Sequence, residues 1–120
     1  MSNVMELRHK ELVERVCKPG EEIMKTITPI QADLIHCVMG LSGEAGELLD
    51  AVKKHCIYGK PLDMDNVIEE MGDIEFFLER IRYLLGLNRM SILSVNYEKL
   101  MKRYPEGYSD KHAQERLDKK

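Results

Sequence analysis

The sequence is poor in the features that mark several classes of protein. It has no tryptophan, only four prolines and no low-complexity tract, while 43% of its 120 residues are hydrophobic and 32% are charged. This balance is typical of a soluble helical protein and excludes a chain that is disordered as a whole. A chain of this length has room for one ordinary core, so we expect a single domain over residues 1–120.

Long apolar runs and an excess of basic residues are also missing. No run approaches the roughly 18 residues needed to span a bilayer, and the polar N-terminal segment lacks the pattern of a signal peptide. We therefore expect a cytoplasmic protein with no membrane partner. The formal net charge is -3 and the basic residues are dispersed along the chain, which argues against duplex nucleic acid as a partner.

Cysteines are few and widely separated. They are Cys17, Cys37 and Cys56, and their spacing excludes the paired cysteines of a zinc knuckle or a redox motif. We expect reduced structural thiols. A nucleophilic cysteine is the alternative, although none of the three lies beside a basic cluster that would favour the thiolate.

Apolar residues recur at helical spacing, and no alternating pattern long enough to indicate a strand occurs. Residues 4–17 predict a first helix that ends before Pro19 and is followed by a loop. Thr28 and Gln31 have the spacing of a capping box, so a second helix begins after Thr28 and reaches about residue 57.

The remaining helices are predicted from local start and stop signals. A third helix begins after Asp63 or Asp65 and is closed by Gly86, and a fourth begins after Asn88 and stops before Pro105. The tail from residue 109 predicts one more short helix. The fold class is therefore all-α and four-helix-bundle-like, with a helical core over about 4–104 and a tail over 105–120.

Four acidic residues form two pairs at a spacing of three. They are Glu44, Glu47, Glu70 and Asp73. Each pair shares a helix face, and at about 100° per residue Glu70 falls inside the apolar arc of the third helix, with Asp73 at its edge. Carboxylates in apolar surroundings are costly unless a cation coordinates them. All-oxygen ligation favours Mg²⁺ or Mn²⁺ over zinc, so the four acids predict a magnesium site for a phosphate-bearing substrate.

Other interpretations of the second helix stay open. Acidic residues three positions apart are common on the solvated face of a helix, so the pair Glu44 and Glu47 does not by itself require a metal. Gly40, Gly43 and Gly46 each cost about 1 kcal/mol relative to alanine, and either a close ligand or a tightly packed neighbouring helix would offset that cost. A di-iron site is disfavoured because no histidine stands three residues after Glu44 or Glu70.

The segments Leu41–Leu48 and Ile68–Asp73 resemble the two-part motif of the MazG family of nucleotide pyrophosphohydrolases. Members carry Glu-x-x-Glu, a variable spacer and Glu-x-x-Asp, and here residues 48–69 form the spacer. The resemblance implies an all-α fold whose acids coordinate Mg²⁺. It also implies that an activated water cleaves a nucleoside triphosphate between the α and β phosphates, releasing monophosphate and pyrophosphate.

The resemblance continues beyond the acids and extends to assembly. A segment of the fourth helix is similar to one that approaches the nucleotide in MazG-like proteins, which implies Asn96, Lys99 and Arg103 as substrate contacts; ordinary surface polarity is the alternative. Family members usually form homodimers or homotetramers. Phe76 and Tyr83 lie off the main apolar arc of the third helix, which indicates a second buried surface and is consistent with self-association.

Catalytic and further substrate-binding roles are assigned to a few other side chains. One carboxylate is expected to orient or deprotonate water; Glu47 and Glu70 are the candidate catalytic residues, and a purely metal-binding role for all four acids is the alternative. Lys54 is a candidate phosphate contact, or else an ion-pair partner of Asp50. His36 is a candidate for a base pocket, or else polar packing.

Two competing functions fit the same acids or the same helices. A phosphoribosyl-ATP pyrophosphohydrolase is a relative with similar helices and carboxylates. A non-catalytic helical module that binds nucleotide or protein belongs to another class, and the intact acids argue against it.

Overall fold

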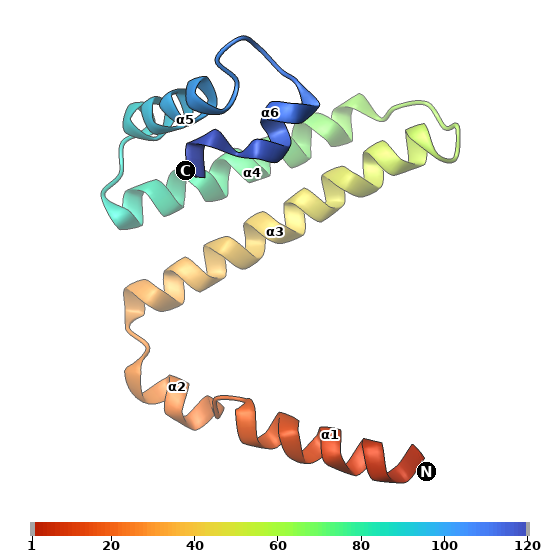
Figure 1. Ribbon diagram of the computed structural model, residues 1–120, viewed down its shortest axis with the longest axis vertical. Helices are drawn as coiled ribbons and strands as arrows, with labels where there is room; N and C mark the ends of the chain where they lie inside the picture. Colours follow the sequence, from red (N-terminus) through yellow and green to blue (C-terminus); the bar gives the residue numbers. More distant parts are fainter. Residues whose placement is uncertain (1, 120) are drawn as a thin grey trace. The chain divides into compact units, whose positions relative to one another are not determined.

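The computed structural model describes residues 2–119, with side chains from residue 3, and is built from helices (Figure 1). Pro105 and Gly107 form an isolated β-bridge, and no strand occurs within residues 2–119. The predicted all-α fold is confirmed. In this described range no helix is both long and apolar enough to cross a bilayer. Internal contacts divide the chain into two compact units, Met1–Ala32 and Asp33–Lys120.

The first unit contains two helices where the sequence predicts one. Helix α1 covers Ser2–Val16, close to the predicted range, and a second helix, α2, covers Gly20–Thr26. The predicted loop between Pro19 and Thr28 is therefore wrong. Pro19 is the N-cap of α2 and makes no side-chain hydrogen bond to the helix, so the usual capping signal is missing from the sequence.

Helix α3, Pro29–Cys56, begins with the predicted capping box. The backbone amide of Thr28 donates to Gln31 Oε1 at 2.9 Å, and the amide of Gln31 donates to Thr28 Oγ1 at 3.2 Å. This reciprocal pair satisfies two amides that the helix itself cannot bond. The helix ends with Cys56, one residue before the predicted end.

Helices α4 and α5 also begin and end at their predicted signals. Helix α4, Met64–Leu85, is capped by Asp63, which accepts a hydrogen bond from the amide of Asn66, and it ends at Gly86 with φ 65°. The left-handed conformation there is one that glycine adopts without strain. Helix α5, Arg89–Arg103, is capped by Asn88, whose side chain accepts from two amides of the first turn.

Helices α3 and α4 run antiparallel, joined by the segment 57–63 (Figure 1). Cys37 and Ala51 are the buried apolar residues of α3, and Glu70 is the buried residue of α4. The ring of Phe77 lies directly against the backbone of Gly40. This contact brings the two helices close together about one turn from the predicted acids.

Helix α5 packs on α4, and the chain then folds back onto α5. An apolar groove between α4 and α5 is lined by residues that include Leu78, Ile81 and Leu93. After Ser109 a short helix, α6, covers Asp110–Glu115, and a 3₁₀ helix, η1, covers Leu117–Lys119. The predicted short helix in the tail is confirmed.

Candidate active site

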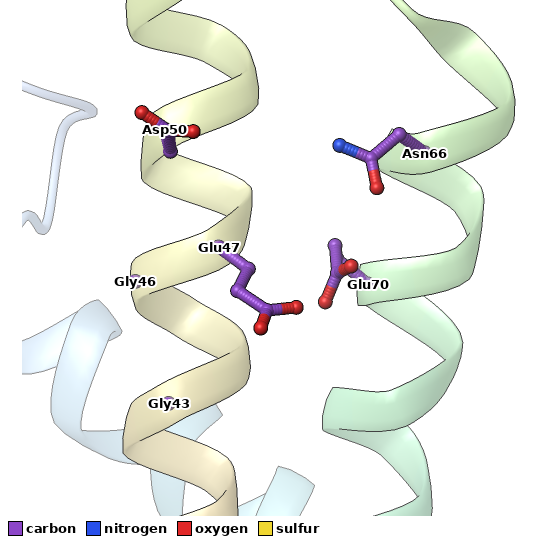
Figure 2. A pocket seen from close by; sticks show the side chains of 6 residues that line it. All are labelled: Gly43, Gly46, Glu47, Asp50, Asn66 and Glu70. Atoms are coloured by element: carbon purple, nitrogen blue, oxygen red, sulfur yellow. The ribbon is translucent and has the colours of Figure 1, made fainter.

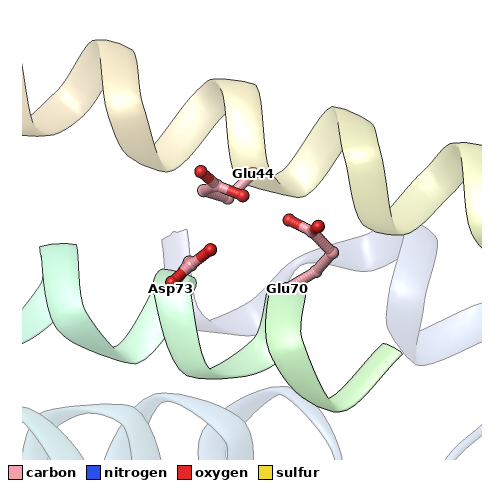
Figure 3. Close-up of side chains that lie close together, drawn as sticks. All are labelled: Glu44, Glu70 and Asp73. Carbon is pink, nitrogen blue, oxygen red and sulfur yellow. The ribbon is translucent and has the colours of Figure 1, made fainter. Parts of the chain in front are cut away.

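Three of the four predicted acids converge between α3 and α4 (Figure 3). Glu44 on α3 and Glu70 and Asp73 on α4 each offer one carboxylate oxygen, and these oxygens all lie within 4.8 Å of one another. The spacing of three residues places Glu70 and Asp73 on one face of α4, and the antiparallel α3 supplies Glu44 opposite them. Oxygen atoms from two helices thus surround one position, the arrangement that a divalent cation requires.

The electrostatics of this cluster favour a positive charge. Glu70 is only 5% exposed, and the adjacent carboxylate of Glu44, burial and the nearby Glu47 raise its pKa to about 8. Among the described residues, the buried Oε2 atoms of Glu44 and Glu70 have no hydrogen-bond partner. Unpaired buried carboxylate oxygens are costly, and coordination of a cation would satisfy them. The residues present therefore fit a hard divalent cation such as Mg²⁺.

Glu47 lies at the border of an adjoining cavity of about 440 Å³ (Figure 2). Its side chain is exposed and points towards Glu70 from α3. The cavity is lined by Gly43, Gly46, Glu47, Asp50, Asn66 and Glu70. A hollow of this volume is in the range of small-molecule sites, so the buried carboxylate of Glu70 is accessible from a space that could hold a phosphate group.

The three glycines of α3 have different surroundings. A Cβ at Gly40 would overlap the ring of Phe77, so tight helix packing is the explanation at this position. At Gly43 and Gly46 no described atom beyond the helix's own backbone lies within 4 Å of an added Cβ, and both residues line the cavity. The absence of side chains there keeps the floor of the cavity open, which favours the ligand explanation for these two.

Two residues of the cavity wall were not assigned to the site from the sequence. Asn66 lies one turn before Glu70 on the same face of α4, and that spacing of four is the signal that would have found it. The sequence indicates Asp50 only as an ion-pair partner of Lys54, whereas in the structure it also lines the cavity. Its carboxylate accepts a salt bridge from Lys54 at 2.9 Å, which lowers the pKa of Asp50.

Of the two other predicted substrate contacts on α3, Lys54 lies beside the cavity and His36 does not line it. Lys54 is exposed and is held beside the cavity by Asp50; the alternative role that the sequence suggested is thus present. His36 is exposed two turns before Glu44 and is not among the residues that line the cavity. Its role in base binding stays a prediction.

The predicted substrate contacts on α5 do not line the cavity beside the acids. Asn96 and Lys99 are exposed on α5, and neither lines the cavity between α3 and α4. Arg103 is tied to the C-terminal segment, where its Nε and one terminal nitrogen donate to the two carboxylate oxygens of Asp118 at 2.7 and 3.1 Å. This pair lies 15 residues apart, so no helical spacing could have revealed it.

Fold and site together define an all-α protein with a carboxylate cluster, suited to a divalent cation, on two antiparallel helices. Residues 34–108 match the family model described as the MazG nucleotide pyrophosphohydrolase domain. Because this match spans more than half of the chain, the protein belongs to the MazG nucleotide pyrophosphohydrolase family. No curated protein and no solved structure matches the chain.

Proposed function

We propose that this protein hydrolyses a nucleoside triphosphate, NTP or dNTP, between the α and β phosphates, releasing a nucleoside monophosphate and pyrophosphate. The observation that carries the proposal is the convergence of Glu44, Glu70 and Asp73 within 4.8 Å. These acids lie inside the region that matches the MazG family, residues 34–108. An exposed cavity beside the buried carboxylate provides the space for a phosphate chain.

Glu44, Glu70 and Asp73 would hold the metal, and we propose Glu47, which borders the adjoining cavity, as a fourth ligand. We propose Mg²⁺ as the natural ion and Mn²⁺ as a substitute, because both accept all-oxygen ligands and share their coordination with substrate phosphates. When bound, the cation would offset the negative charge of the phosphates during hydrolysis. Glu70 must lose its proton to serve as a ligand, since its pKa without metal is about 8.

Glu47 is the proposed residue that orients water. Its carboxylate is exposed at the cavity, so it can accept a proton from a water molecule held there. Glu70 is the less suitable base, because burial and the neighbouring Glu44 favour its protonated form. A general base must lie within reach of the water that it deprotonates, and Glu47 borders the cavity where we propose that this water binds.

Cations near the cavity would compensate the charge of the triphosphate. Lys54 stands beside it through its ion pair with Asp50, and we propose it as a phosphate contact. Asn96, Lys99 and Arg103 are proposed contacts through the resemblance of their segment to nucleotide-binding MazG-like sequences. We also propose a homodimer or homotetramer in the cytoplasm, with the second copy covering apolar residues that are exposed in one chain.

A substrate panel with product analysis tests the proposal. The protein would be incubated with each NTP and dNTP, and with phosphoribosyl-ATP, in Mg²⁺, in Mn²⁺ and in EDTA. We expect at least one nucleoside triphosphate to yield monophosphate and pyrophosphate, only when metal is present. Turnover of phosphoribosyl-ATP alone would identify the related pyrophosphohydrolase, and absence of pyrophosphate from every substrate by folded protein would refute an enzymatic function.

A matched pair of substitutions assigns the activity to the site. Glu70→Gln removes a buried ligand with little change of shape, and we expect turnover to fall by at least about 100-fold. Glu69→Gln changes the neighbouring carboxylate, which is exposed and outside the cluster, and should leave turnover nearly unchanged. Equal activity of the two variants would remove Glu70 from the site.

A further inference from the structure

Asn66 differs in its chemistry from the other residues of the cavity wall. The six lining residues include two glycines and three carboxylates, and only Asn66 carries N–H groups on its side chain. The amide of Asn66 points from α4 towards α3, at the level of Asp50 and one turn from Glu70 (Figure 2). Among these six residues, an anion in the cavity can therefore receive a side-chain hydrogen bond only from Asn66.

The start of helix α4 does not explain an asparagine at this position. Asn66 lies in the first turn, where asparagine side chains often bond free backbone amides. Here Asp63 is already the cap, and its carboxylate accepts from the backbone amide of Asn66 at 3.1 Å. The side chain of Asn66 is half-buried and makes no hydrogen bond within residues 33–119. Alanine would be the better helix former, so the amide group of this side chain is left for a ligand.

Lys54 adds a positive charge at the same end of the cavity. Its Nζ lies 2.9 Å from Oδ2 of Asp50, which lines the cavity opposite Asn66 (Figure 2). At the other end the carboxylates of Glu47 and Glu70 point towards one another, and among the described residues the buried Oε2 of Glu70 has no hydrogen-bond partner. The cavity thus has hydrogen-bond donors at one end and carboxylates at the end that adjoins the proposed cation.

This difference between the two ends orients a triphosphate. Phosphate oxygens that no metal binds are stabilised by N–H donors and by positive charge. One helical turn, about 5.4 Å, separates the two ends, and a diphosphate group can bridge that distance. We propose that the β and γ phosphates of the substrate lie at Asn66 and Lys54, so that Asn66 binds the pyrophosphate leaving group. The inference rests on the proposed function and adds the direction in which the substrate lies.

The proposed orientation places the α phosphate at the end of the cavity that carries Glu47 and Glu70. Water attacks the α phosphorus and gives a proton to Glu47, while the bond from the α phosphorus to the bridging oxygen breaks and its electron pair leaves with pyrophosphate. Asn66 and Lys54 hold phosphate oxygens that do not react, so they bind substrate and transition state alike. Loss of Asn66 should therefore raise KM and leave kcat nearly unchanged.

Titration with inorganic pyrophosphate tests this contact without turnover. Calorimetry would measure the affinity for Mn²⁺ alone and then for pyrophosphate in the presence of Mn²⁺. Because Asn66 donates to a charged group, we expect Asn66→Ala to raise the Kd of pyrophosphate about 10-fold to 100-fold and to leave the Kd of Mn²⁺ unchanged. Asp65→Asn is the matched control, since Asp65 is the preceding residue, exposed and outside the cavity; it should leave both constants nearly unchanged.

Asn66→Asp distinguishes a hydrogen-bond donor from a metal ligand. Aspartate has nearly the shape of asparagine but no side-chain N–H when ionised, so the affinity for pyrophosphate should fall at least as far as in Asn66→Ala. A ligand role for the amide oxygen predicts instead that Asn66→Ala weakens the binding of Mn²⁺ alone and that Asn66→Asp retains it. That result would overturn the proposal. Circular dichroism and thermal unfolding would check the fold of each variant.

Steady-state kinetics completes the test. With a triphosphate that the native protein hydrolyses, Asn66→Ala should raise KM about 10-fold to 100-fold. An unchanged KM, an unchanged affinity for pyrophosphate, or a native protein that does not bind pyrophosphate would each overturn the proposed orientation. A native protein that hydrolyses no triphosphate would refute the proposed function instead, and the pyrophosphate titrations would then decide alone whether Asn66 binds phosphate.

Discussion

Replacing Gly40 by alanine should separate the two helices that carry the acids. A Cβ built on Gly40 meets the tip of the Phe77 ring, at 2.5 Å from Cε1 and 2.7 Å from Cε2. Carbon atoms pack at about 3.5–4.0 Å, so the ring or the helix must move by roughly 1 Å. Gly40 lies one turn before Glu44, and Phe77 lies one turn after Asp73. Movement at this contact therefore widens the gap between the ligands.

Gly40→Ala should reduce Mn²⁺ affinity more than it reduces the stability of the fold. Overpacking costs about 1–3 kcal/mol, and the gain in helix propensity returns about 1 kcal/mol, so the net loss of stability should be between about 0 and 2 kcal/mol. Metal sites tolerate changes in ligand distance of only about 0.2 Å. We therefore expect the affinity for Mn²⁺ to fall about 10-fold to 100-fold while the protein stays folded.

The assay is direct titration with Mn²⁺, followed by electron paramagnetic resonance, beside thermal unfolding. Gly72→Ala is the matched control, because no described atom beyond its own helix lies within 4 Å of a Cβ there. It should raise stability and leave Mn²⁺ affinity unchanged. Phe77→Leu in the Gly40→Ala background should restore part of the affinity. Unchanged Mn²⁺ binding by Gly40→Ala would refute the idea that this contact sets the distance between the acids.

Three further results are expected. Without metal the pKa of Glu70 is about 8, compared with an ordinary value of 4.5. The protonated Glu70 therefore stabilises the fold fully below about pH 4.5, and this stabilisation is lost as the pH rises to 8. The melting temperature in EDTA should fall over this pH range, and either Mg²⁺ or Glu70→Gln should remove the pH dependence. Arg103 lowers the pKa of Asp118 to about 2. The stabilisation of the fold by this ion pair is therefore present above about pH 3.8 and disappears as the pH falls towards 2. Asp118→Asn should accordingly speed hydrogen exchange in the C-terminal segment at neutral pH, and unchanged exchange would contradict the assignment. Lys54→Ala should raise KM about 10-fold with kcat unchanged. The stability of the protein should change little, because the ion pair of Lys54 with Asp50 is exposed. An unchanged KM would exclude Lys54 as a phosphate contact.

Helix ends were predictable wherever the signal is local. The capping box of Thr28 and Gln31, the caps Asp63 and Asn88, and the turn at Gly86 depend on residues within a few positions of one another. Such interactions form whatever the rest of the chain does. Helix α2 was missed because it is only seven residues long and has no side-chain cap at its start.

The sequence alone determined the all-α class, the order of the long helices and the inward position of Glu70, because helical periodicity fixes which residues share a face. It left Glu44 and Glu47 equivalent. Only the pairing of α3 with α4 decided that Glu44 joins Glu70 and Asp73 while Glu47 borders the cavity, because the distance between two helices depends on side chains that meet in space. The same pairing set the different roles of the glycines and raised the pKa of Glu70, since burial and neighbouring charge exist only once the helices have packed.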